Sequence, residues 1–225
     1  MAKAALVTGG SSGIGLAIAR MLREEGFDLT LASRTKEKVE RAAADLGAIA
    51  VAADVSREDD CERLVTAHRE RFGRLDVLVN SAGIGIGGRV EDLSTKHWDL
   101  QLDVNLRGAF IVTREAMPLL KESHALVVNI ASIAGTIPAP GLAAYAASKA
   151  AMISLTRSLN AELDGDGVRC TALCPAFVDT AMAQWSGLNS EEMIRPEDCP
   201  EVVRMLLRLS PRARIPQVVV ERVGS

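Results

Sequence analysis

Short apolar runs and longer stretches of helical periodicity alternate along the chain. The apolar runs are mostly continuous, which is typical of strands that are buried on both faces of a parallel sheet. We predict strands at Ala4–Thr8, Asp28–Ala32, Ala48–Ala53, Leu75–Asn80, Ala125–Ala131, Val168–Cys174 and Gln217–Glu221. We predict helices at Gly13–Glu25, Lys36–Leu46, Arg57–Phe72, Thr95–Leu120, Ala143–Leu163 and Pro200–Leu209.

This alternation of strand and helix predicts an α/β protein with a Rossmann fold, a doubly wound seven-stranded parallel sheet with helices on both faces. The 225 residues suffice for one full core but not for two generous domains, so we expect a single domain over residues 1–225. Ligands of such sheets bind outside the carboxyl ends of the strands. The glycine-rich and polar motifs of this chain follow those predicted ends.

Composition narrows the class of protein. Apolar residues make up 48% and charged residues 24% of the chain, and the formal net charge is -3. These values are ordinary for a folded soluble protein and give no sign of the basic surface that binds nucleic acid. The start, MAKAALVTGG, does not resemble a signal peptide, and no uncharged apolar stretch is long enough to span a membrane. We therefore expect neither nucleic acid nor membrane as a partner.

The cysteines give a further indication of compartment. They form neither a CxxC pair nor a zinc-binding spacing, so we expect reduced, apolar fillers and no metal site. Reduced thiols favour a cytoplasmic location. The four residues are Cys61, Cys170, Cys174 and Cys199.

A glycine-rich turn joins the first predicted strand to the first helix, in the segment Thr8-Gly9-Gly10-Ser11-Ser12-Gly13-Ile14-Gly15. A backbone without side chains can approach a pyrophosphate closely, and the N–H groups at a helix N-terminus bind its charge. The spacing is GxxxGxG rather than the more usual GxGxxG. A tight strand-to-helix turn without any ligand is the alternative interpretation.

The end of the second predicted strand indicates which nicotinamide cofactor would bind. An NAD site places a carboxylate near this point to bind the ribose hydroxyls, but this chain has Ser33-Arg34. A carboxylate would repel a 2′-phosphate, whereas an arginine pairs with it through charge-assisted hydrogen bonds. We predict NADP(H) rather than NAD(H). The alternative is that Arg34 is an ordinary exposed charge.

The only tyrosine, Tyr145, precedes Lys149 by four residues in a strongly helical stretch, so both lie on one helix face. A phenol with a pKa near ~10 is a poor base, but a nearby ammonium lowers that pKa and favours general acid and base catalysis. Ser132, after the fifth predicted strand, would hydrogen-bond a substrate oxygen. Each residue also has a purely structural interpretation. Tyr145 could be a buried aromatic ring, Lys149 a solvated helix charge and Ser132 a turn cap.

Together these motifs resemble the short-chain dehydrogenase/reductase (SDR) family, from about residue 3 to residue 180 and weakly beyond. The motifs, in order, are Thr8-Gly9-x-x-x-Gly13-x-Gly15, Asp54-Val55, Asn80-Ser81-Ala82-Gly83, Asn105, Ser132 and Tyr145-x-x-x-Lys149. The family's usual second asparagine is Ser81 here, and a glycine that usually follows Pro175 is Ala176. Neither departure removes a catalytic group, although the Ala176 methyl would narrow the space beside the nicotinamide.

The resemblance implies roles for further residues. Asp54 and Val55 would flank the adenine, and Asn80 would brace the central strand. Lys149 would also hold the nicotinamide ribose, and Asn105 would complete a proton relay through water. The catalytic residues implied are Asn105, Ser132, Tyr145 and Lys149. The cofactor-binding residues predicted are Gly9, Ser11, Ser12, Gly13, Ile14, Gly15, Ser33, Arg34, Asp54, Val55, Asn80, Ala82, Gly83, Tyr145, Lys149, Pro175, Val178 and Thr180.

The predicted function is an NADP(H)-dependent oxidoreductase that interconverts an alcohol and a ketone or aldehyde. The side chains near the predicted strand ends are uncharged, which favours a small apolar substrate; they are Ile84, Ile86, Ile137, Leu142 and Phe177. Residues 181–195 stand where the family carries a mobile lid. Within them, Met182, Trp185 and Leu188 either cover the substrate or simply pack.

Two other functions are compatible with such a sheet. One is a catalytically idle NADP(H)-binding sensor or scaffold, which would need no activated phenol and so leaves Ser132, Tyr145 and Lys149 unexplained. The other is a methyltransferase, which Arg34 and the tyrosine–lysine pair disfavour.

The predicted helix over residues 143–163 is apolar or small on nearly every side, whereas a surface helix should show a polar face. We expect it to pack on the sheet and also on another subunit. The resemblance implies a dimer interface built from the helices at 95–120 and 143–163, in a homodimer or homotetramer. A monomer that exposes alanine is the alternative.

Overall fold

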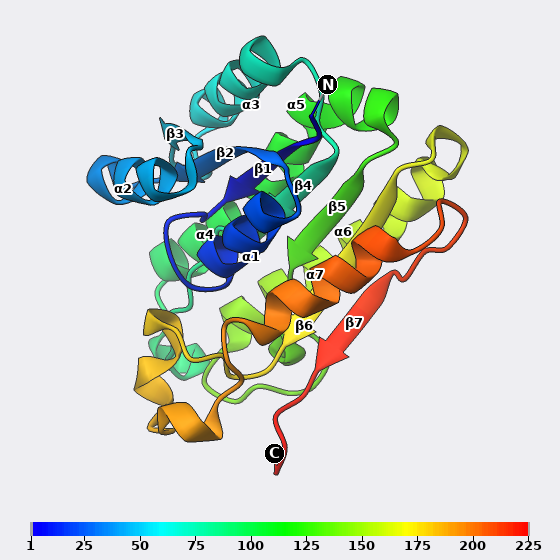
Figure 1. Ribbon diagram of the computed structural model, residues 1–225. Coiled ribbons are helices and arrows are strands. Elements are labelled where there is room, and N and C mark those ends of the chain that lie inside the picture. The colour runs from blue at the N-terminus through cyan, green and yellow to red at the C-terminus, as the bar shows by residue number, and fades with distance from the viewer. Residues whose placement is uncertain (1, 225) are drawn as a thin grey trace.

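Seven parallel strands form the centre of the molecule in the computed structural model, which describes residues 2–224 apart from the Trp185 side chain (Figure 1). Their order across the sheet is β3-β2-β1-β4-β5-β6-β7, as a doubly wound fold requires. The strands are β1 (Ala4–Thr8), β2 (Asp28–Ser33), β3 (Ile49–Ala52), β4 (Val77–Asn80), β5 (Leu126–Ile130), β6 (Arg169–Pro175) and β7 (Gln217–Val220).

Helices cover both faces of the sheet (Figure 1). On one face, Val7 packs in a core with residues of α1 (Gly13–Glu24), α2 (Lys36–Leu46) and α7 (Asp198–Arg208). On the other face, Leu6 packs with residues of α3 (Glu58–Phe72), α5 (Gly108–Ser123) and α6 (Ala143–Glu162). Because neighbouring residues of β1 enter opposite cores, both faces need apolar side chains. This explains the continuous apolar runs of the sequence.

The order of the strands creates a crevice at the edge of the sheet formed by their carboxyl ends. After β3 at one edge, the chain crosses to β4, which pairs with β1 on the side opposite β2. The connections beyond β1 and β4 therefore diverge at their carboxyl ends. In open α/β sheets this switch point is where ligands bind.

One predicted helix is divided in the structure. The segment predicted as a single helix over 95–120 consists of α4 (Thr95–Leu102), a π-helical turn (Asp103–Arg107) and α5. The Gly108 N–H donates to the carbonyl of Asp103, five residues back, and this wider turn buries Asn105 completely. A Cβ on Gly108 would lie 2.6 Å from the Val55 carbonyl oxygen, so the helix resumes in direct contact with the segment after β3.

The other differences from the predicted elements lie at their ends. Helix α3 begins at Glu58 rather than Arg57, because Arg57 is extended and stands at the N-cap. Helix α7 begins at Asp198, two residues before the predicted start. Strand β4 begins at Val77 rather than Leu75. Shifts of one or two residues at the end of an element are common and do not change the order of the elements.

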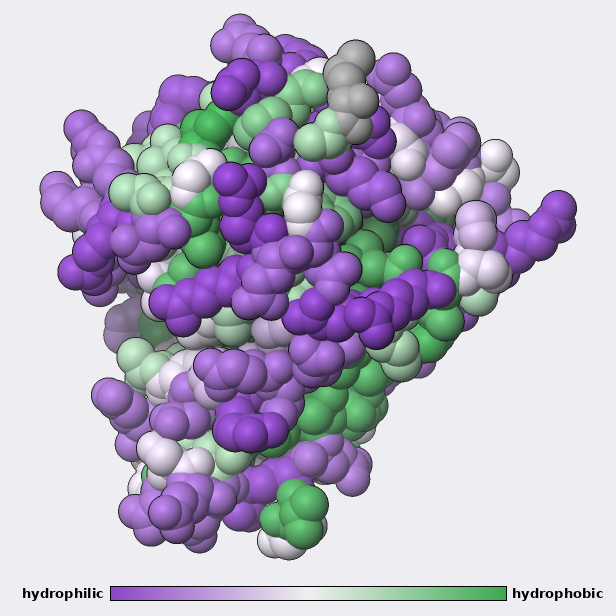
Figure 2. Space-filling view, viewed as in Figure 1, coloured by the Kyte–Doolittle hydropathy of each residue, from purple (hydrophilic) through white to green (hydrophobic). Residues whose placement is uncertain are grey.

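The surface of the face seen in Figure 2 is largely hydrophilic, with a hydrophobic area over β7. On β7, Val219 is 41% exposed, and on α7, Met205 is 42% exposed. Within residues 2–224 no helix has the length and apolar character needed to cross a membrane. All four cysteines are free and buried.

Candidate active site

Two adjoining cavities lie at the carboxyl ends of the strands. The larger, of about 280 Å³, contains Tyr145 and is called the tyrosine cavity below. The smaller, of about 200 Å³, contains Arg34 and is called the arginine cavity. Both are lined by Gly9, Ser12 and Gly83, so they form one crevice across the switch point between β1 and β4.

The glycine-rich turn lies tightly against the segment after β4. The Thr8 hydroxyl accepts hydrogen bonds from the N–H groups of Ser81, at 3.1 Å, and Ala82, at 3.2 Å. A Cβ on Gly9 would lie 2.9 Å from backbone atoms of both residues, and Gly9 has a φ of 65°. A Cβ on Gly15 would lie 2.5 Å from the Gly9 carbonyl oxygen. These glycines are therefore required by close approach of two backbone segments.

The N-terminus of α1 opens onto this crevice. Ser12 stands at the N-cap without a side-chain capping hydrogen bond, and the first turn contains no acidic side chain. The first N–H groups of a helix have no intrahelical partners, and the helix dipole favours an anion there. Because Gly13 and Ile14 also line the tyrosine cavity, the turn fits the pyrophosphate of a dinucleotide.

The arginine cavity contains two cationic side chains. Arg34 follows β2, and Lys38 lies in the first turn of α2. Both are exposed, and the described residues that line this cavity include no carboxylate. The prediction from sequence used Arg34 and missed Lys38. Its position four residues after Arg34, at the start of a predicted helix, is the signal that would have revealed it.

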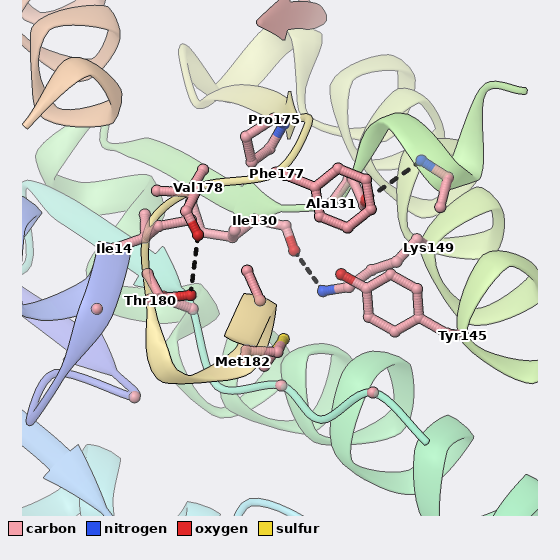
Figure 3. A pocket seen from close by; sticks show the side chains of 18 of the residues that line it. Ile14, Ile130, Ala131, Tyr145, Lys149, Pro175, Phe177, Val178, Thr180 and Met182 are labelled. Atoms are coloured by element: carbon pink, nitrogen blue, oxygen red, sulfur yellow. Dashed lines mark hydrogen bonds between the residues drawn. The ribbon is translucent and has the colours of Figure 1, made fainter. Parts of the chain in front are cut away.

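The three side chains with candidate chemistry meet in the tyrosine cavity. Ser132 follows β5, while Tyr145 and Lys149 occupy the first two turns of α6. The Ser132 hydroxyl lies close enough to the Tyr145 phenol to act on its pKa, which it lowers. Lys149 Nζ donates to the Ile130 carbonyl at 2.7 Å and lies 5.6 Å from the centroid of the Tyr145 ring (Figure 3). The predicted alternative for Ser132 also holds, because its Oγ accepts from Ala134 N–H as a turn cap.

Burial dominates the protonation of this group. It raises the pKa of Tyr145 above the usual value, while the hydrogen bond with Ser132 acts in the opposite direction. It also lowers the pKa of Lys149 to about 8. The sequence predicted that Lys149 would lower the pKa of Tyr145. The structure gives the opposite net direction because removal from water disfavours the charged form of each group.

Asn105 braces the site from the π-helical turn. Its Oδ1 accepts from Ile84 N–H at 2.8 Å, and its Nδ2 donates to the Ile84 carbonyl and to Ser148 Oγ. Ser148 Oγ in turn donates to the Tyr145 carbonyl at 2.7 Å. This amide therefore ties the loop after β4 to α6. Ser148 was missed by the sequence prediction, because its partner is distant along the chain.

Asn80 lies in a second polar chain, beneath the cavities. Its Nδ2 donates to Thr113 Oγ1 at 3.1 Å and to Asn129 Oδ1 at 2.8 Å. The Asn129 amide continues the chain by donating to Thr156 Oγ1. These bonds connect α5, β4, β5 and α6 inside the core and use both hydrogens of the Asn80 amide, whereas its Oδ1 has no hydrogen-bond partner among the described residues. They support the bracing role that the resemblance implied for Asn80.

Most predicted cofactor residues line the crevice. These are Gly9, Ser11, Ser12, Gly13, Ile14, Ser33, Arg34, Val55, Ala82, Gly83, Tyr145, Lys149, Pro175, Val178 and Thr180. The predicted cofactor residues that line neither cavity are Gly15, Asp54 and Asn80, and the predicted catalytic residue Asn105 lines neither. The Asp54 carboxylate is engaged with Ser56, from which it accepts two hydrogen bonds.

An apolar side closes the tyrosine cavity. Of the predicted apolar residues, Leu142, Phe177 and Met182 line it, and Figure 3 shows Tyr145, Phe177 and Met182 around the same opening. Ile84 lines the arginine cavity instead. The residues that line neither cavity are Ile86, Ile137 and Leu188. The side chain of Trp185 lies outside the described part of the structure.

The predicted lid has its own local structure. Residues 181–195 contain two short 3₁₀ helices, η5 (Ala181–Ser186) and η6 (Ser190–Glu192). The Asp179 N–H donates to the Ile194 carbonyl and the Ile194 N–H to the Phe177 carbonyl, each at 2.9 Å. These two bonds hold the ends of the segment together beside the cavity.

Comparison with known proteins places this geometry in context. A family model described as short chain dehydrogenase matches residues 3–190. An uncharacterised oxidoreductase of Staphylococcus aureus is 34% identical over 225 residues, which is 98% of this chain and 97% of the relative. An uncharacterised oxidoreductase of Staphylococcus epidermidis is 33% identical over 224 residues, with the same coverage.

Two solved structures share the fold. An alcohol dehydrogenase from Thermococcus sibiricus, complexed with 5-hydroxy-NADP, has a TM-score of 0.91 and 31% identity, over 99% of this chain and 97% of that one. A 3-ketoacyl-(acyl-carrier-protein) reductase from Brucella melitensis, complexed with NADH, has a TM-score of 0.90 and 30% identity, with the same coverage.

Proposed function

Because the chain belongs to the short-chain dehydrogenase family, we propose that it is an NADP(H)-dependent oxidoreductase that interconverts an alcohol and a ketone or aldehyde. One observation carries the proposal. Ser132, Tyr145 and Lys149 meet in a cavity that continues into the arginine cavity. A protein that only binds a dinucleotide needs no buried phenol beside a hydroxyl and an ammonium.

The residues present fit the whole cofactor. The N-terminus of α1 would hold the pyrophosphate, and Arg34 and Lys38 would hold the 2′-phosphate that distinguishes NADP from NAD. When bound, NADP(H) supplies the hydride of the reaction. Similar structures carry either 5-hydroxy-NADP or NADH, so the fold alone does not select the cofactor. The choice of NADP(H) rests on the two cations and on the lack of a carboxylate among the described residues around them.

Tyr145 is the proposed proton donor in carbonyl reduction. A phenol with an ordinary pKa near ~10 already carries its proton at neutral pH, and burial raises the pKa of Tyr145 further. Ser132 Oγ accepts from Ala134 N–H, which leaves its own hydrogen to donate to the tyrosine or to a substrate oxygen. Such a hydrogen bond stabilises the negative charge that develops on that oxygen.

Lys149 has a positioning and electrostatic role in this proposal. The bond to the Ile130 carbonyl fixes the ammonium behind the tyrosine ring. Lys149 also lines the cavity in which the resemblance implies that the nicotinamide ribose would lie. Asn105 supports the same region through Ile84 and Ser148, and its part in a proton relay is proposed from the resemblance alone.

The substrate side of the cavity is apolar. Leu142, Phe177 and Met182 line it, and Lys149 is the only charged residue among the described lining residues. A cationic substrate group would lose hydration there without a partner, and an anionic group would find only Lys149, which is already bonded to the Ile130 carbonyl. We therefore propose an uncharged, predominantly apolar carbonyl compound as the substrate.

A substrate screen tests the proposal directly. Oxidation of NADPH and of NADH by purified protein would be followed with ketones, aldehydes, quinones and acyl thioesters. We expect turnover of uncharged apolar carbonyls, with kcat/KM at least roughly tenfold higher for NADPH, the smallest factor that one charge-assisted contact supplies. Tight NADPH binding without turnover of any class would favour the sensor or scaffold instead. A preference for NADH would contradict the cofactor assignment.

We also infer a homodimer or homotetramer in the cytoplasm. Trp98 on α4 is 38% exposed and Phe110 on α5 is 45% exposed, on the helices expected to form the interface. Covering such rings on a second subunit would remove apolar area from water. Light scattering from the purified protein measures the assembly, and a monomeric mass would contradict this inference. The four free thiols support a reducing compartment.

A further inference from the structure

Gly135 lies where the turn after Ser132 meets α6. This turn, η3 (Ile133–Gly135), connects the end of β5 to the segment before α6. A Cβ on Gly135 would lie 2.7 Å from the Lys149 carbonyl carbon, 2.8 Å from the Ala150 nitrogen and 3.0 Å from the Lys149 carbonyl oxygen. All three atoms belong to the helix backbone and have no flexible end that can move aside. Any side chain at this position must therefore separate the turn from the helix.

The requirement for glycine here is steric and not conformational. The φ angle of Gly135 lies outside the left-handed region, so alanine can adopt its backbone conformation. Gly141, a few residues further on, differs because its φ is 76° and nothing lies near its missing Cβ. The two glycines serve different purposes, and at Gly135 that purpose is close contact with Lys149.

The turn is held by several hydrogen bonds, so its parts move together. The Gly135 N–H donates to the Ser132 carbonyl at 3.0 Å, and the Ala134 N–H donates to Ser132 Oγ at 3.2 Å. Thr136 Oγ1 donates to the Ile133 carbonyl at 2.7 Å. A displacement at Gly135 is therefore carried back to the Ser132 hydroxyl.

Lys149 is held both at its backbone and at the tip of its side chain. The backbone of Lys149 contacts Gly135, and its ammonium donates to the Ile130 carbonyl at the end of β5 (Figure 3). Tyr145 lies one helical turn before Lys149 and lines the same cavity as Ser132. The packing of the turn on α6 thus sets the separation of the two reacting hydroxyls.

We propose that Gly135 is a positioning residue whose missing side chain sets the distance between the hydroxyls of Ser132 and Tyr145. This inference rests on the proposed oxidoreductase function. Gly135 touches neither substrate nor cofactor in this role. It acts through Ser132, by letting the turn approach the backbone of Lys149.

Gly135→Ala is the primary test. We expect kcat for carbonyl reduction with NADPH to fall about 10- to 100-fold, because a misplacement of about 1 Å can cost that much. The Kd for NADPH should change much less than kcat, since the glycine-rich turn and Arg34 are untouched and only the Lys149 backbone lies beside the substitution. The matched control is Gly165→Ala in η4 (Asp164–Asp166), where a Cβ would meet nothing within 4 Å. It should retain full activity.

A double-mutant cycle separates positioning from general damage. If Gly135 acts through Ser132, Gly135→Ala should reduce kcat by less than about twofold in a Ser132→Ala background, although it has a large effect in the parent protein. Equal fold losses in the two backgrounds would overturn the proposal. The pH profile is a second readout. The bond from Ser132 lowers the pKa of Tyr145, so weakening it should move the apparent pKa of kcat upward.

Thermal unfolding checks that the variant is folded. If Gly135→Ala does not fold, Thr136→Val replaces it, because that exposed substitution removes only the bond to the Ile133 carbonyl. It should give a smaller loss of kcat that again disappears in the Ser132→Ala background, and parent-like kcat would overturn the proposal. A parent protein that reduces no carbonyl contradicts the proposed function. An active parent with a fully active Gly135→Ala variant contradicts only the positioning role.

Discussion

The two halves of the crevice handle charge in opposite ways. In the arginine cavity, Arg34 and Lys38 stand at the surface and remain in contact with water. In the tyrosine cavity, Lys149 is only 4% exposed, and burial moves its pKa to about 8. Recognition of a phosphate needs fixed positive charge and tolerates solvent. Proton transfer depends on the pKa values of the reacting groups, which burial shifts and contact with water would restore.

The difference means that the two halves should respond separately to substitution. Changes in the tyrosine cavity should alter turnover while leaving NADPH bound. Changes in the arginine cavity should alter the apparent affinity for one cofactor while leaving the proton chemistry intact. Loss of this separation would show that the crevice works as one undivided unit.

Tyr145→Phe should give the largest effect. The ring and its packing remain, but the proton donor is lost, so we expect kcat for carbonyl reduction to fall about a thousandfold or more. Steady-state rates and fluorescence titration of NADPH measure turnover and binding on the same preparation. The Kd for NADPH should change little. Retention of substantial activity by this variant would contradict the role of Tyr145 and remove the contrast between the two halves.

Arg34→Ala should give a smaller and more selective effect. We expect kcat/KM for NADPH to fall roughly 10- to 100-fold, the range of one charge-assisted phosphate contact, while the value for NADH stays the same or rises. Lys38→Ala should act in the same direction but less strongly, since an ammonium cannot form a bidentate pair. In both variants, kcat at saturating NADPH should match that of the parent.

Two neighbouring cations provide matched controls for this prediction. Lys36 and Arg41 lie on α2, are exposed and line neither cavity. Their alanine variants should keep the parent's ratio of kcat/KM for NADPH over NADH. If all four variants lose activity equally, net surface charge rather than a phosphate site explains the effect. Parallel losses with NADPH and NADH in Arg34→Ala would likewise rule out recognition of the 2′-phosphate.

Much of the fold and part of the candidate site could be predicted from the local sequence pattern. The continuous apolar run at Ala4–Thr8 and its glycine-rich continuation predicted a buried strand and a tight turn that lines the crevice, because each depends on adjacent residues. The four-residue spacing of Tyr145 and Lys149 likewise determines that they share a helix face. Their convergence with Ser132 required the family resemblance, and the structure places all three in one cavity.

Other features depend on contacts that local pattern does not contain. The π-helical turn at Asn105 divides a stretch whose sequence is helical throughout, because its bonds to Ile84 and Ser148 come from distant elements. The net rise in the pKa of Tyr145 depends on how deeply the ring is buried, which its spacing from Lys149 does not reveal. Lys38 has its proposed role in binding the 2′-phosphate only because α2 begins beside the end of β2.

The sequence by itself therefore determined the parallel sheet and the order of its motifs, since periodicity and spacing are local properties, and it predicted which side chains are reactive. The tertiary structure decided how those side chains meet. It made Tyr145 a buried acid, placed Lys38 beside Arg34 and brought Gly135 against the backbone of Lys149. Burial and close approach are properties of packed surfaces, and these exist only after separate segments of the chain have come together.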